Sequence, residues 1–310
     1  MERLKVGVIG AGYFGRFHAE KYNRNPKVNL IGIADIDFQR AQEVAKKNHT
    51  QPFSDPTDLF DKVDAVSIVV PTPQHFLVTR EFLQRGIHVL LEKPITSTLD
   101  EARSLVSLAQ AKNLVFQIGH LERFNPALTA LSPTLTNPRF IESHRLQSFI
   151  ERALDVDVIM DLMIHDIDII LSLVKSDVKE VRATGIPVIS PHIDIANARI
   201  AFENGCVANI TASRVSLKAM RKIRIFQPNA YFSIDFAQRK VSIHRKKPEK
   251  NGIYPKITEE VISPPEYDPL EMEIQAFVES VLTQTPPPVT GQDGLKALQV
   301  AIEIHKQIGA

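Results

Sequence analysis

Up to about residue 120, short apolar runs alternate with amphipathic segments along the chain. The runs are LKVGVIG (4–10), NLIGIAD (29–35), AVSIVV (65–70), HVLLEK (88–93) and LVFQIGH (114–120). The segments between them, such as QRAQEVAKKNH (39–49) and TLDEARSLVSLAQAKN (98–113), repeat their apolar residues with the period of a helix. This order predicts right-handed βαβ crossovers and therefore a Rossmann domain, with a doubly wound parallel sheet, over residues 1–120.

Beyond residue 138 the pattern changes to that of hairpin strands. Two segments alternate apolar and polar residues, IANARIAFENGCVANITASRVS (195–216) and KIRIFQPNAYFSIDFAQRKVSIHRKK (222–247), with turns at ENG and QPNA. Two helical patterns follow, DPLEMEIQAFVESVLTQ (268–284) and QDGLKALQVAIEIHKQ (292–307). Residues 121–310 are therefore predicted to form an α+β domain with a large, mostly antiparallel open sheet.

One apolar segment carries more charge than a core helix should. DVDVIMDLMIHDIDII (155–170) is mostly Val, Ile, Leu and Met, yet it contains several acids and a histidine. At about 100° per residue, one narrow face of a helix gathers Asp157, Asp161, His165 and Asp168. The remaining circumference is apolar, so this polar stripe is expected to face a site rather than solvent.

Length, charge and cysteine content exclude several classes of protein. The chain has 310 residues, which suggests two domains, and its formal net charge of +1 gives no argument for a nucleic-acid partner. The single cysteine, Cys206, excludes an internal disulfide and a thiolate metal cluster. The start MERLKVGVIGAG lacks the features of a signal peptide, and the sequence has no run of 18 apolar residues. We therefore expect a cytoplasmic protein that does not enter a membrane.

A glycine motif, GAGYFG, follows the first predicted strand and opens a helix. Its glycines, Gly10, Gly12 and Gly15, would allow a tight turn, close approach to a pyrophosphate and close packing of helix on strand. Asp35 ends the second strand, where an acid accepts hydrogen bonds from the adenosine ribose. The acid would repel a 2′-phosphate, so NAD is expected in preference to NADP, although Arg40 is a nearby cation.

Two further motifs end strands at the same predicted edge of the sheet. LLEKP (90–94) places Lys93 beyond the fourth strand, where ligands of open α/β sheets bind. VVPTPQH (69–75) ends the third strand and places His75 near the nicotinamide or its ribose. A solvated surface lysine and a helix-start histidine without a role are the competing interpretations.

The charged segment can supply acid–base chemistry at this edge. Asp161 and His165, one helical turn apart, can hydrogen-bond, and Lys93 can polarise an oxygen, which together are the parts of an alcohol dehydrogenase that needs no metal. Two alternatives are a divalent metal held by Asp161, His165 and Asp168, and a purely structural stripe.

These motifs resemble those of the glucose-fructose oxidoreductase, inositol dehydrogenase and rhizopine catabolism (Gfo/Idh/MocA) family over essentially the whole chain. The resemblance is carried by GAGYFG, by EKP (92–94) and by Asp161, His165 and Asp168 as Asp-x3-His-x2-Asp. It implies a bound nicotinamide dinucleotide, catalysis by Lys93, Asp161 and His165, and an open sheet that joins subunits into a homo-oligomer. Leu162, Met163 and Ile164 depart from the glycines that many members have near the catalytic Asp.

The expected binding residues follow from these motifs. Those assigned to the cofactor are Gly10, Gly12, Tyr13, Phe14, Gly15, Asp35, Pro71, Thr72, His75, Glu92, Lys93 and Pro94. Those assigned to the substrate are Arg123, Asn125, Asp168, Arg214 and Arg221. No residue is assigned to a metal.

The expected substrate is a sugar, with its ring hydroxyl as the reacting group. The segments GHLERFNPAL (119–128) and SRVSLKAMRKIR (213–224) look most like the members that oxidise the 3-hydroxyl of UDP-N-acetylglucosamine-type nucleotide sugars. Cations in the second segment could neutralise a diphosphate, or could instead be solvated or lie at a subunit interface. The alternatives are a dehydrogenase of free monosaccharides or inositols, and a dinucleotide-binding regulatory protein without turnover.

Overall fold

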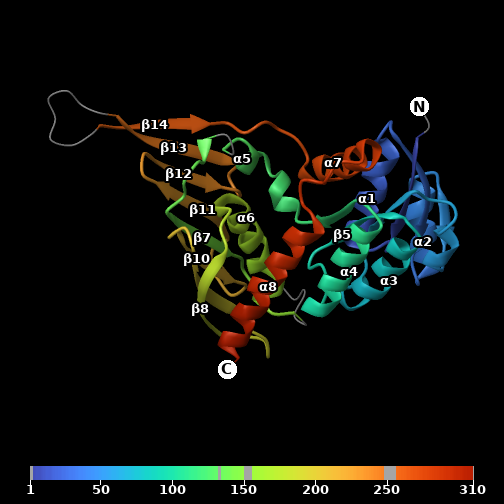
Figure 1. Cartoon of the computed structure of the whole chain (residues 1–310), viewed down its shortest axis with the longest axis horizontal. Helices are drawn as coiled ribbons and strands as arrows, with labels where there is room; N and C mark the ends of the chain where they lie inside the picture. Colours follow the sequence, from blue (N-terminus) through green and yellow to red (C-terminus); the bar gives the residue numbers. More distant parts are fainter. Residues whose placement is uncertain (1–2, 132–133, 150–155, 248–255, 310) are drawn as a thin grey trace. The chain divides into compact units, whose positions relative to one another are not determined.

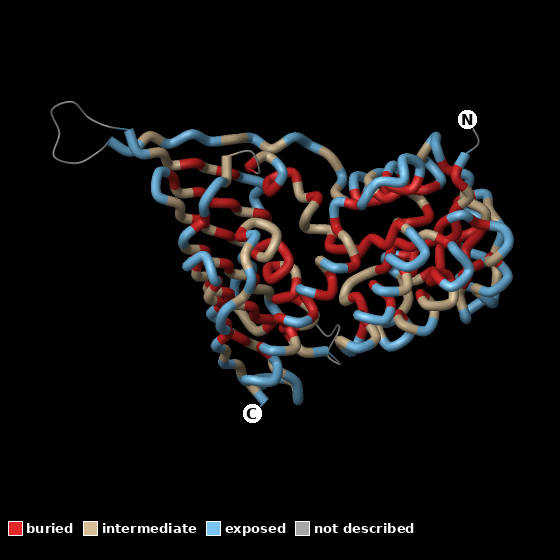
Figure 2. Tube along the Cα trace, viewed as in Figure 1, coloured by how far each residue is buried: buried red, intermediate tan, exposed pale blue. Residues whose placement is uncertain are grey.

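The chain divides into two compact units (Figure 1). The computed structural model describes residues 3–131, 134–149, 156–247 and 256–309. The first unit comprises Met1–Leu121 and Tyr267–Leu298, and the second comprises Glu122–Glu266 and Gln299–Ala310. Figure 2 shows a buried interior in each.

The first unit is built on a parallel sheet, as predicted. In its described residues the sheet has six strands in the order β3-β2-β1-β4-β5-β6. The strands are β1 (Leu4–Ile9), β2 (Val28–Ala34), β3 (Gln51–Phe53), β4 (Ala65–Ile68), β5 (His88–Glu92) and β6 (Phe116–Gly119). The edge strand β3 was not predicted, because three residues that include a proline give no periodic signal.

Helices connect these strands in the expected alternation. They are α1 (Tyr13–Arg24), α2 (Phe38–Lys47), the 3₁₀ turn η1 (Pro56–Leu59), α3 (Thr72–Gln84) and α4 (Leu99–Ala111). Side chains in the preceding loops set where two of them begin. Asp37 accepts the Arg40 N–H at the start of α2, and Thr98 and Glu101 form a capping box at the start of α4.

Residues 267–298 belong to the first unit, which differs from the predicted division at residue 120. The helix α7 (Pro269–Thr283) buries Ile274 and Phe277 in the same apolar core as β1 and α1. Figure 1 shows α7 beside α1, although more than 200 residues separate them along the chain. The amphipathic pattern predicted the helix but could not identify which sheet its apolar face covers.

The second unit contains the predicted large sheet. In its described residues the sheet has eight strands in the order β14-β13-β12-β11-β7-β10-β9-β8, antiparallel except for the β7–β10 pair. The strands are β7 (Phe140–Leu146), β8 (Val178–Ile186), β9 (Ile195–Phe202), β10 (Val207–Ser213), β11 (Met220–Gln227), β12 (Ala230–Asp235), β13 (Lys240–Lys247) and β14 (Lys256–Ile262). Its other described elements are η2 (Leu121–Phe124), α5 (Pro126–Thr129), a π-helical turn η4 (Ile159–Met163) and α6 (Ile164–Val174). The last helix, α8 (Gly291–Ile308), belongs to the first unit up to Leu298 and to the second from Gln299.

The charged segment is not one uniform α-helix. It begins with the π-helical turn η4 and continues as α6, which packs against β7 and β10 (Figure 1). Since a π-helix bonds each residue to the fifth along the chain, the step of 100° per residue fails across residues 159–163. The direction of Asp161 relative to His165 therefore differs from the one that even α-helical spacing predicts.

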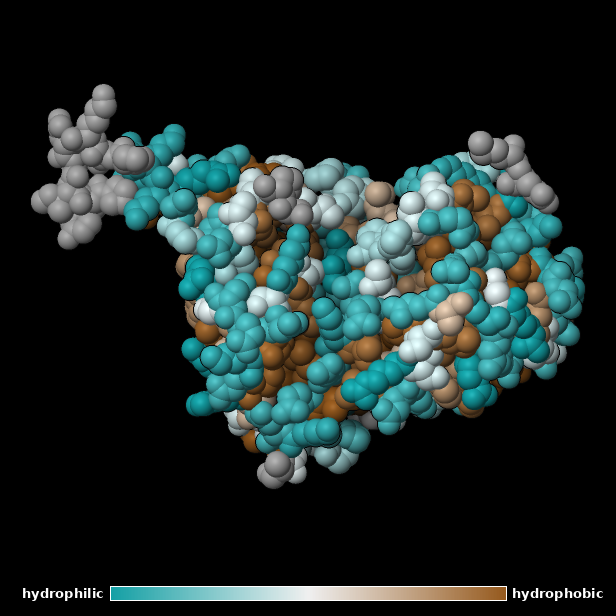
Figure 3. All heavy atoms as spheres, in the orientation of Figure 1, coloured by the Kyte–Doolittle hydropathy of each residue, from teal (hydrophilic) through white to brown (hydrophobic). Residues whose placement is uncertain are grey.

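The visible surface mixes polar and apolar residues. Figure 3 shows hydrophilic side chains over most of this face of both units, with smaller groups of hydrophobic ones among them. Within the described ranges, we find no helix that combines the length and the apolar character needed to cross a membrane.

We expect Phe277→Ala to destabilise the first unit by about 3–5 kcal/mol, because its side chain is fully buried in that core. Leu282→Ala on the same helix, where the side chain is 43% exposed, should cost less than about 1 kcal/mol. Urea titration of the full chain followed by circular dichroism measures both. Equal small effects would contradict the assignment of α7 to this core.

Candidate cofactor and catalytic site

The turn between β1 and α1 is shaped by glycines with different roles. Gly10 has a φ of +98°, and a side chain on Gly15 would place its Cβ 1.8 Å from the Gly10 carbonyl oxygen. These two positions therefore need glycine for the fold itself. A Cβ on Gly12 would meet nothing within 4 Å, so this position is open for a ligand to approach the backbone.

The start of α1 offers backbone donors to an anion. Gly12 is its N-cap residue and provides no side-chain cap, and the first turn, which is described completely, contains no acidic residue. The first N–H groups of a helix have no partner within the helix, and the helix dipole adds positive potential there. This geometry suits a phosphate or pyrophosphate.

Asp35 connects the glycine turn to the end of β2. Its Oδ2 accepts the Ala11 N–H at 2.7 Å and its Oδ1 accepts the Asp37 N–H at 2.9 Å. Arg40 lies 3.9 Å from the Asp35 carboxylate and 3.2 Å from that of Asp37. The charge of Arg40 is thus opposed by two acids.

A cleft of about 750 Å³ lies at this carboxyl edge of the parallel sheet, within the size range of small-molecule sites. Eight of the predicted cofactor residues line it: Gly10, Gly12, Tyr13, Phe14, Asp35, Pro71, Glu92 and Lys93. Its wall also contains residues that the sequence analysis did not single out, among them Ile36, Pro56, Gln74 and Val78. In the described structure, Gly15, Thr72, His75 and Pro94 are not part of this lining.

His75 lies behind the cleft rather than on its surface. It is 1% exposed, and its Nδ1 and Nε2 lie 2.8 Å from the Pro94 carbonyl and 2.9 Å from the Val70 carbonyl. Burial lowers the pKa of His75, which favours the neutral ring and hence one N–H donor. The neutral imidazole donates to one of these carbonyls and packs between the loops after β4 and β5, behind the cleft.

Lys93 follows β5 directly and adjoins a buried polar pair. The Lys93 N–H donates to Glu92 Oε2 at 3.3 Å, and Glu92 Oε1 lies 3.2 Å from Nε2 of the fully buried His18. Nδ1 of His18 contacts Ser67 at 3.1 Å. The pKa of Glu92 is lowered, because the hydrogen bond and charge of His18 and the charge of Lys93 outweigh its burial.

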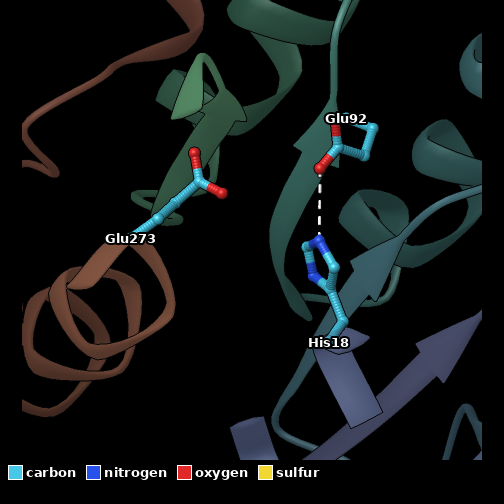
Figure 4. A group of neighbouring side chains, drawn as sticks. All are labelled: His18, Glu92 and Glu273. Atoms are coloured by element: carbon cyan, nitrogen blue, oxygen red, sulfur yellow. Dashed lines mark hydrogen bonds and ion pairs between the residues drawn. The ribbon is translucent and has the colours of Figure 1, made fainter. Parts of the chain in front are cut away.

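Glu273 of α7 completes this cluster, and the sequence analysis missed it. It is fully buried, and its carboxylate points toward His18 and Glu92 (Figure 4). The amphipathic pattern of α7 could have identified Glu273, because this acid lies on the apolar face of the helix with Leu270, Ile274 and Phe277.

The charges of the 155–170 segment have separate functions in the second unit, and Asp155 lies outside the described residues. Asp157 accepts the N–H groups of Ile159 and Met160, each at 2.9 Å, and so caps the π-helical turn. Asp161 and His165 are half-buried, one in that turn and the other in α6. Lys93 belongs to the first unit, and Asp161 and His165 to the second.

Two aspartates of α6 form buried ion pairs. Asp166 receives Arg145 at 2.7 and 3.3 Å, and Arg145 also donates to Glu122 at 3.0 Å. Asp168, only 1% exposed, receives Nε and Nη2 of Arg123 at 2.7 and 3.0 Å. Both oxygens of Asp168 are therefore engaged by an arginine, which argues against its use as a metal ligand beside Asp161 and His165.

The other residues assigned to the substrate are also placed in the second unit. Asn125 caps α5 through the Ala127 N–H and donates to Glu122. Arg214 is 4% exposed, donates to the Val156 carbonyl and lies 3.7 Å from Asp194, so its charge is compensated inside the protein. The side chain of Arg221 is 52% exposed on β11 and remains accessible to a ligand.

Comparison with known proteins agrees with the folds of the two units. Residues 4–120 match the model described as "Oxidoreductase family, NAD-binding Rossmann fold", and residues 129–231 match the "GFO/IDH/MocA C-terminal domain". UDP-N-acetylglucosamine 3-dehydrogenase of Acidithiobacillus ferrooxidans is 39% identical, over 100% of this chain and 99% of the relative. A solved structure of that enzyme superposes with a TM-score of 0.93 at 37% identity, covering 99% of this chain and 98% of the other.

A more distant structure shares the fold alone. Scyllo-inositol dehydrogenase from Lactobacillus casei, solved with NAD(H) and scyllo-inositol, has a TM-score of 0.82 at 22% identity, over 99% of this chain and 97% of the other. The family assignment rests on two family models that match successive parts of the chain, and on a relative that matches its full length. The chain belongs to the Gfo/Idh/MocA family of NAD-binding oxidoreductases.

Proposed function

We propose that the protein is an NAD-dependent dehydrogenase of a nucleotide sugar, acting on the 3-hydroxyl of a UDP-N-acetylglucosamine-type substrate. The observation that carries this proposal is the likeness, over the whole length of both chains, to a UDP-N-acetylglucosamine 3-dehydrogenase. The cleft in the first unit supports the cofactor half of the proposal, because its glycine turn and helix start suit a pyrophosphate.

The cofactor is proposed to be NAD rather than NADP. Asp35 lines the cleft at the end of β2, where its carboxylate accepts ribose hydroxyls and repels a 2′-phosphate. Arg40, the cation beside it, is already opposed by Asp35 and Asp37. A 2′-phosphate would therefore meet more negative than positive charge.

The proposed chemistry divides between three side chains. The nicotinamide, when bound, accepts or returns the hydride. His165 takes or gives the hydroxyl proton, Asp161 orients the imidazole, and Lys93 stabilises the negative charge on the oxygen as it becomes a carbonyl.

Substrate recognition is proposed to use the second unit. Arg221 is the exposed cation for a diphosphate, whereas the buried Arg214 is not part of this proposal. The Arg123–Asp168 pair would fix the guanidinium of Arg123 toward the sugar. The alternatives are a dehydrogenase of inositols or free sugars, and a binding protein without turnover.

The exposed face of the large sheet is proposed to join copies of the chain into a homo-oligomer. Its residues alternate with buried ones along β7, β9 and β10, and it carries a row of neighbouring, half-buried rings. These rings are Phe140, Phe226, Tyr231 and His244, with neighbouring centroids 5.8, 4.8 and 4.9 Å apart. Aromatic side chains of this kind are enriched at protein interfaces.

Gly12→Ala should weaken NAD binding by about tenfold or more while leaving the melting temperature nearly unchanged, because its Cβ meets no protein atom but lies where the pyrophosphate approaches. Gly15→Ala is the matched contrast. Its Cβ would overlap the Gly10 carbonyl, so it should lower the melting temperature in the absence of cofactor. Calorimetric titration with NAD measures the loss of binding, and thermal melting without cofactor measures the loss of stability. A Gly12→Ala protein that binds NAD normally would contradict the cofactor placement.

Replacing the acid–base residues should remove turnover without removing NAD. His165→Ala and Lys93→Met should each lower kcat by about 10²–10⁴-fold, since that is the usual contribution of general acid–base catalysis. Asp161→Asn should lose less, because it orients His165 rather than transferring the proton itself. Steady-state rates and NAD titrations on each variant test this. Inactivation by a chelator, reversed by a divalent ion, would favour metal catalysis instead.

The substrate is tested by supplying UDP-N-acetylglucosamine, related nucleotide sugars, free sugars and inositols, each with NAD or NADP, and following the absorbance of the reduced cofactor. Arg221→Ala should raise the KM for the UDP-sugar and leave residual turnover of the free sugar unchanged. Arg182→Ala, an exposed arginine of β8, is the control. Turnover of free inositol with none of UDP-sugars would overturn the substrate assignment.

A further inference from the structure

The first unit contains a buried acid that the proposed chemistry does not use. Atoms of His18, Glu92 and Glu273 that could bind an ion or share a proton lie within 4.8 Å of one another (Figure 4). They come from α1, the end of β5 and α7. The cluster adjoins the cleft, because Glu92 lines it and precedes Lys93.

The two carboxylates differ sharply in their partners. Glu92 contacts His18 and the Lys93 N–H, and its side chain keeps 17% of its surface exposed. Glu273 is 0% exposed, and neither of its carboxylate oxygens has a hydrogen-bond partner among the described residues. Two adjacent buried carboxylates cannot both be ionised cheaply, so the charge belongs on the one with partners.

We propose that Glu273 is a neutral carboxylic acid, and that by staying neutral it leaves Glu92 as the single negative charge that pairs with His18 and positions Lys93 at the cleft. Glu273 is thus a positioning residue that acts through Glu92. This role for Lys93 rests on the proposed function, whereas the neutral state of Glu273 does not.

The electrostatics of the cluster agree with this distribution of charge. Burial, and then the charge of Glu92, raise the pKa of Glu273 well above its usual range. The titratable groups that face Glu273 are Glu92, His18 and Tyr22, and burial raises the pKa of the Tyr22 hydroxyl, which keeps it neutral. A bound divalent ion is the competing account, because His18, Glu92 and Glu273 offer ligand atoms within 4.8 Å of one another, and metal analysis of the purified protein distinguishes the two.

The test is the dependence of stability on pH in Glu273→Gln, where the amide replaces the neutral acid. Glu273 keeps its proton in the folded unit above the value of 4.5 usual for an exposed Glu, so unfolding releases a proton between the two pKa values. Its contribution to stability is complete below about pH 4.5 and is lost as the pH rises through the raised pKa. The unaltered protein should therefore lose stability relative to the variant as pH rises.

The melting temperature of Glu273→Gln, minus that of the unaltered protein, should increase by about 3 °C per pH unit within this window. Glu271→Gln makes the same change on the exposed side of α7, where the side chain is 63% exposed, and serves as the matched control for the loss of a carboxylate. Neither measurement needs the substrate, so the outcome is independent of the proposed function.

A second measurement detects the proton itself. Infrared spectra of protein labelled with ¹³C-glutamate should show the carbonyl stretch of a protonated, buried acid at pH values above the usual Glu range, and Glu273→Gln or Glu273→Met should remove it. In the enzyme assay, kcat of Glu273→Gln should match that of the unaltered protein at the acid end of the pH range and decline less as the pH rises, with the KM for NAD unchanged.

The proposal would be overturned by a pH-independent difference in melting temperature, or by the absence of the protonated-acid band. Stoichiometric metal in the purified protein that is lost in Glu273→Gln would overturn it in favour of an ion site. The positioning of Lys93 is tested separately. It would be overturned if the melting temperatures followed the prediction while the decline of kcat at high pH was the same in both proteins.

Discussion

A buried charge must be paired or neutralised, and this constraint organises the polar interior of both units. In the second unit Asp166 pairs with Arg145, and Asp168 pairs with Arg123. Asp194, also fully buried, accepts three successive backbone N–H groups, which lower its pKa against the effect of burial. In the first unit His18 partners Glu92. The pairs Asp166–Arg145, Asp168–Arg123 and His18–Glu92 each join elements that are distant in sequence, so these polar contacts help to specify how the elements pack.

The same constraint explains why a core segment contains so many acids. Asp157 caps the π-helical turn, and two aspartates of α6, Asp166 and Asp168, form ion pairs with arginines. Asp161 and His165 remain half-buried at the junction of the π-helical turn and α6. π-helical turns are frequent at functional sites, since they re-aim a side chain without ending the helix. Asp161 and His165 therefore lie on a segment that is fixed by a cap at its start and by two ion pairs further along.

The cofactor cleft depends mainly on backbone. Parallel strands bring their carboxyl ends to one edge, where the glycine turn, Asp35 and Lys93 line a common cleft. Gly10 and Gly15 shape the turn, and Asp35 fixes it through the Ala11 N–H. His75 packs behind the cleft between two of its loops. Side chains such as Tyr13, Asp35 and Lys93 also line the space, and the open backbone at Gly12 suits a site that receives phosphates on N–H groups.

The sequence by itself determined the fold of both units, the family motifs and the edge of the sheet at which the cleft lies, because periodicity and glycine spacing are local properties of the chain. Only the tertiary structure decided which core α7 enters, that Arg214 is buried, and that Glu273 meets Glu92 and His18. These outcomes depend on contacts between residues far apart in sequence. A helical pattern shows which face of a helix is apolar. Which surface covers that face, and which side chain pairs with a charge on it, is decided only when the chain folds.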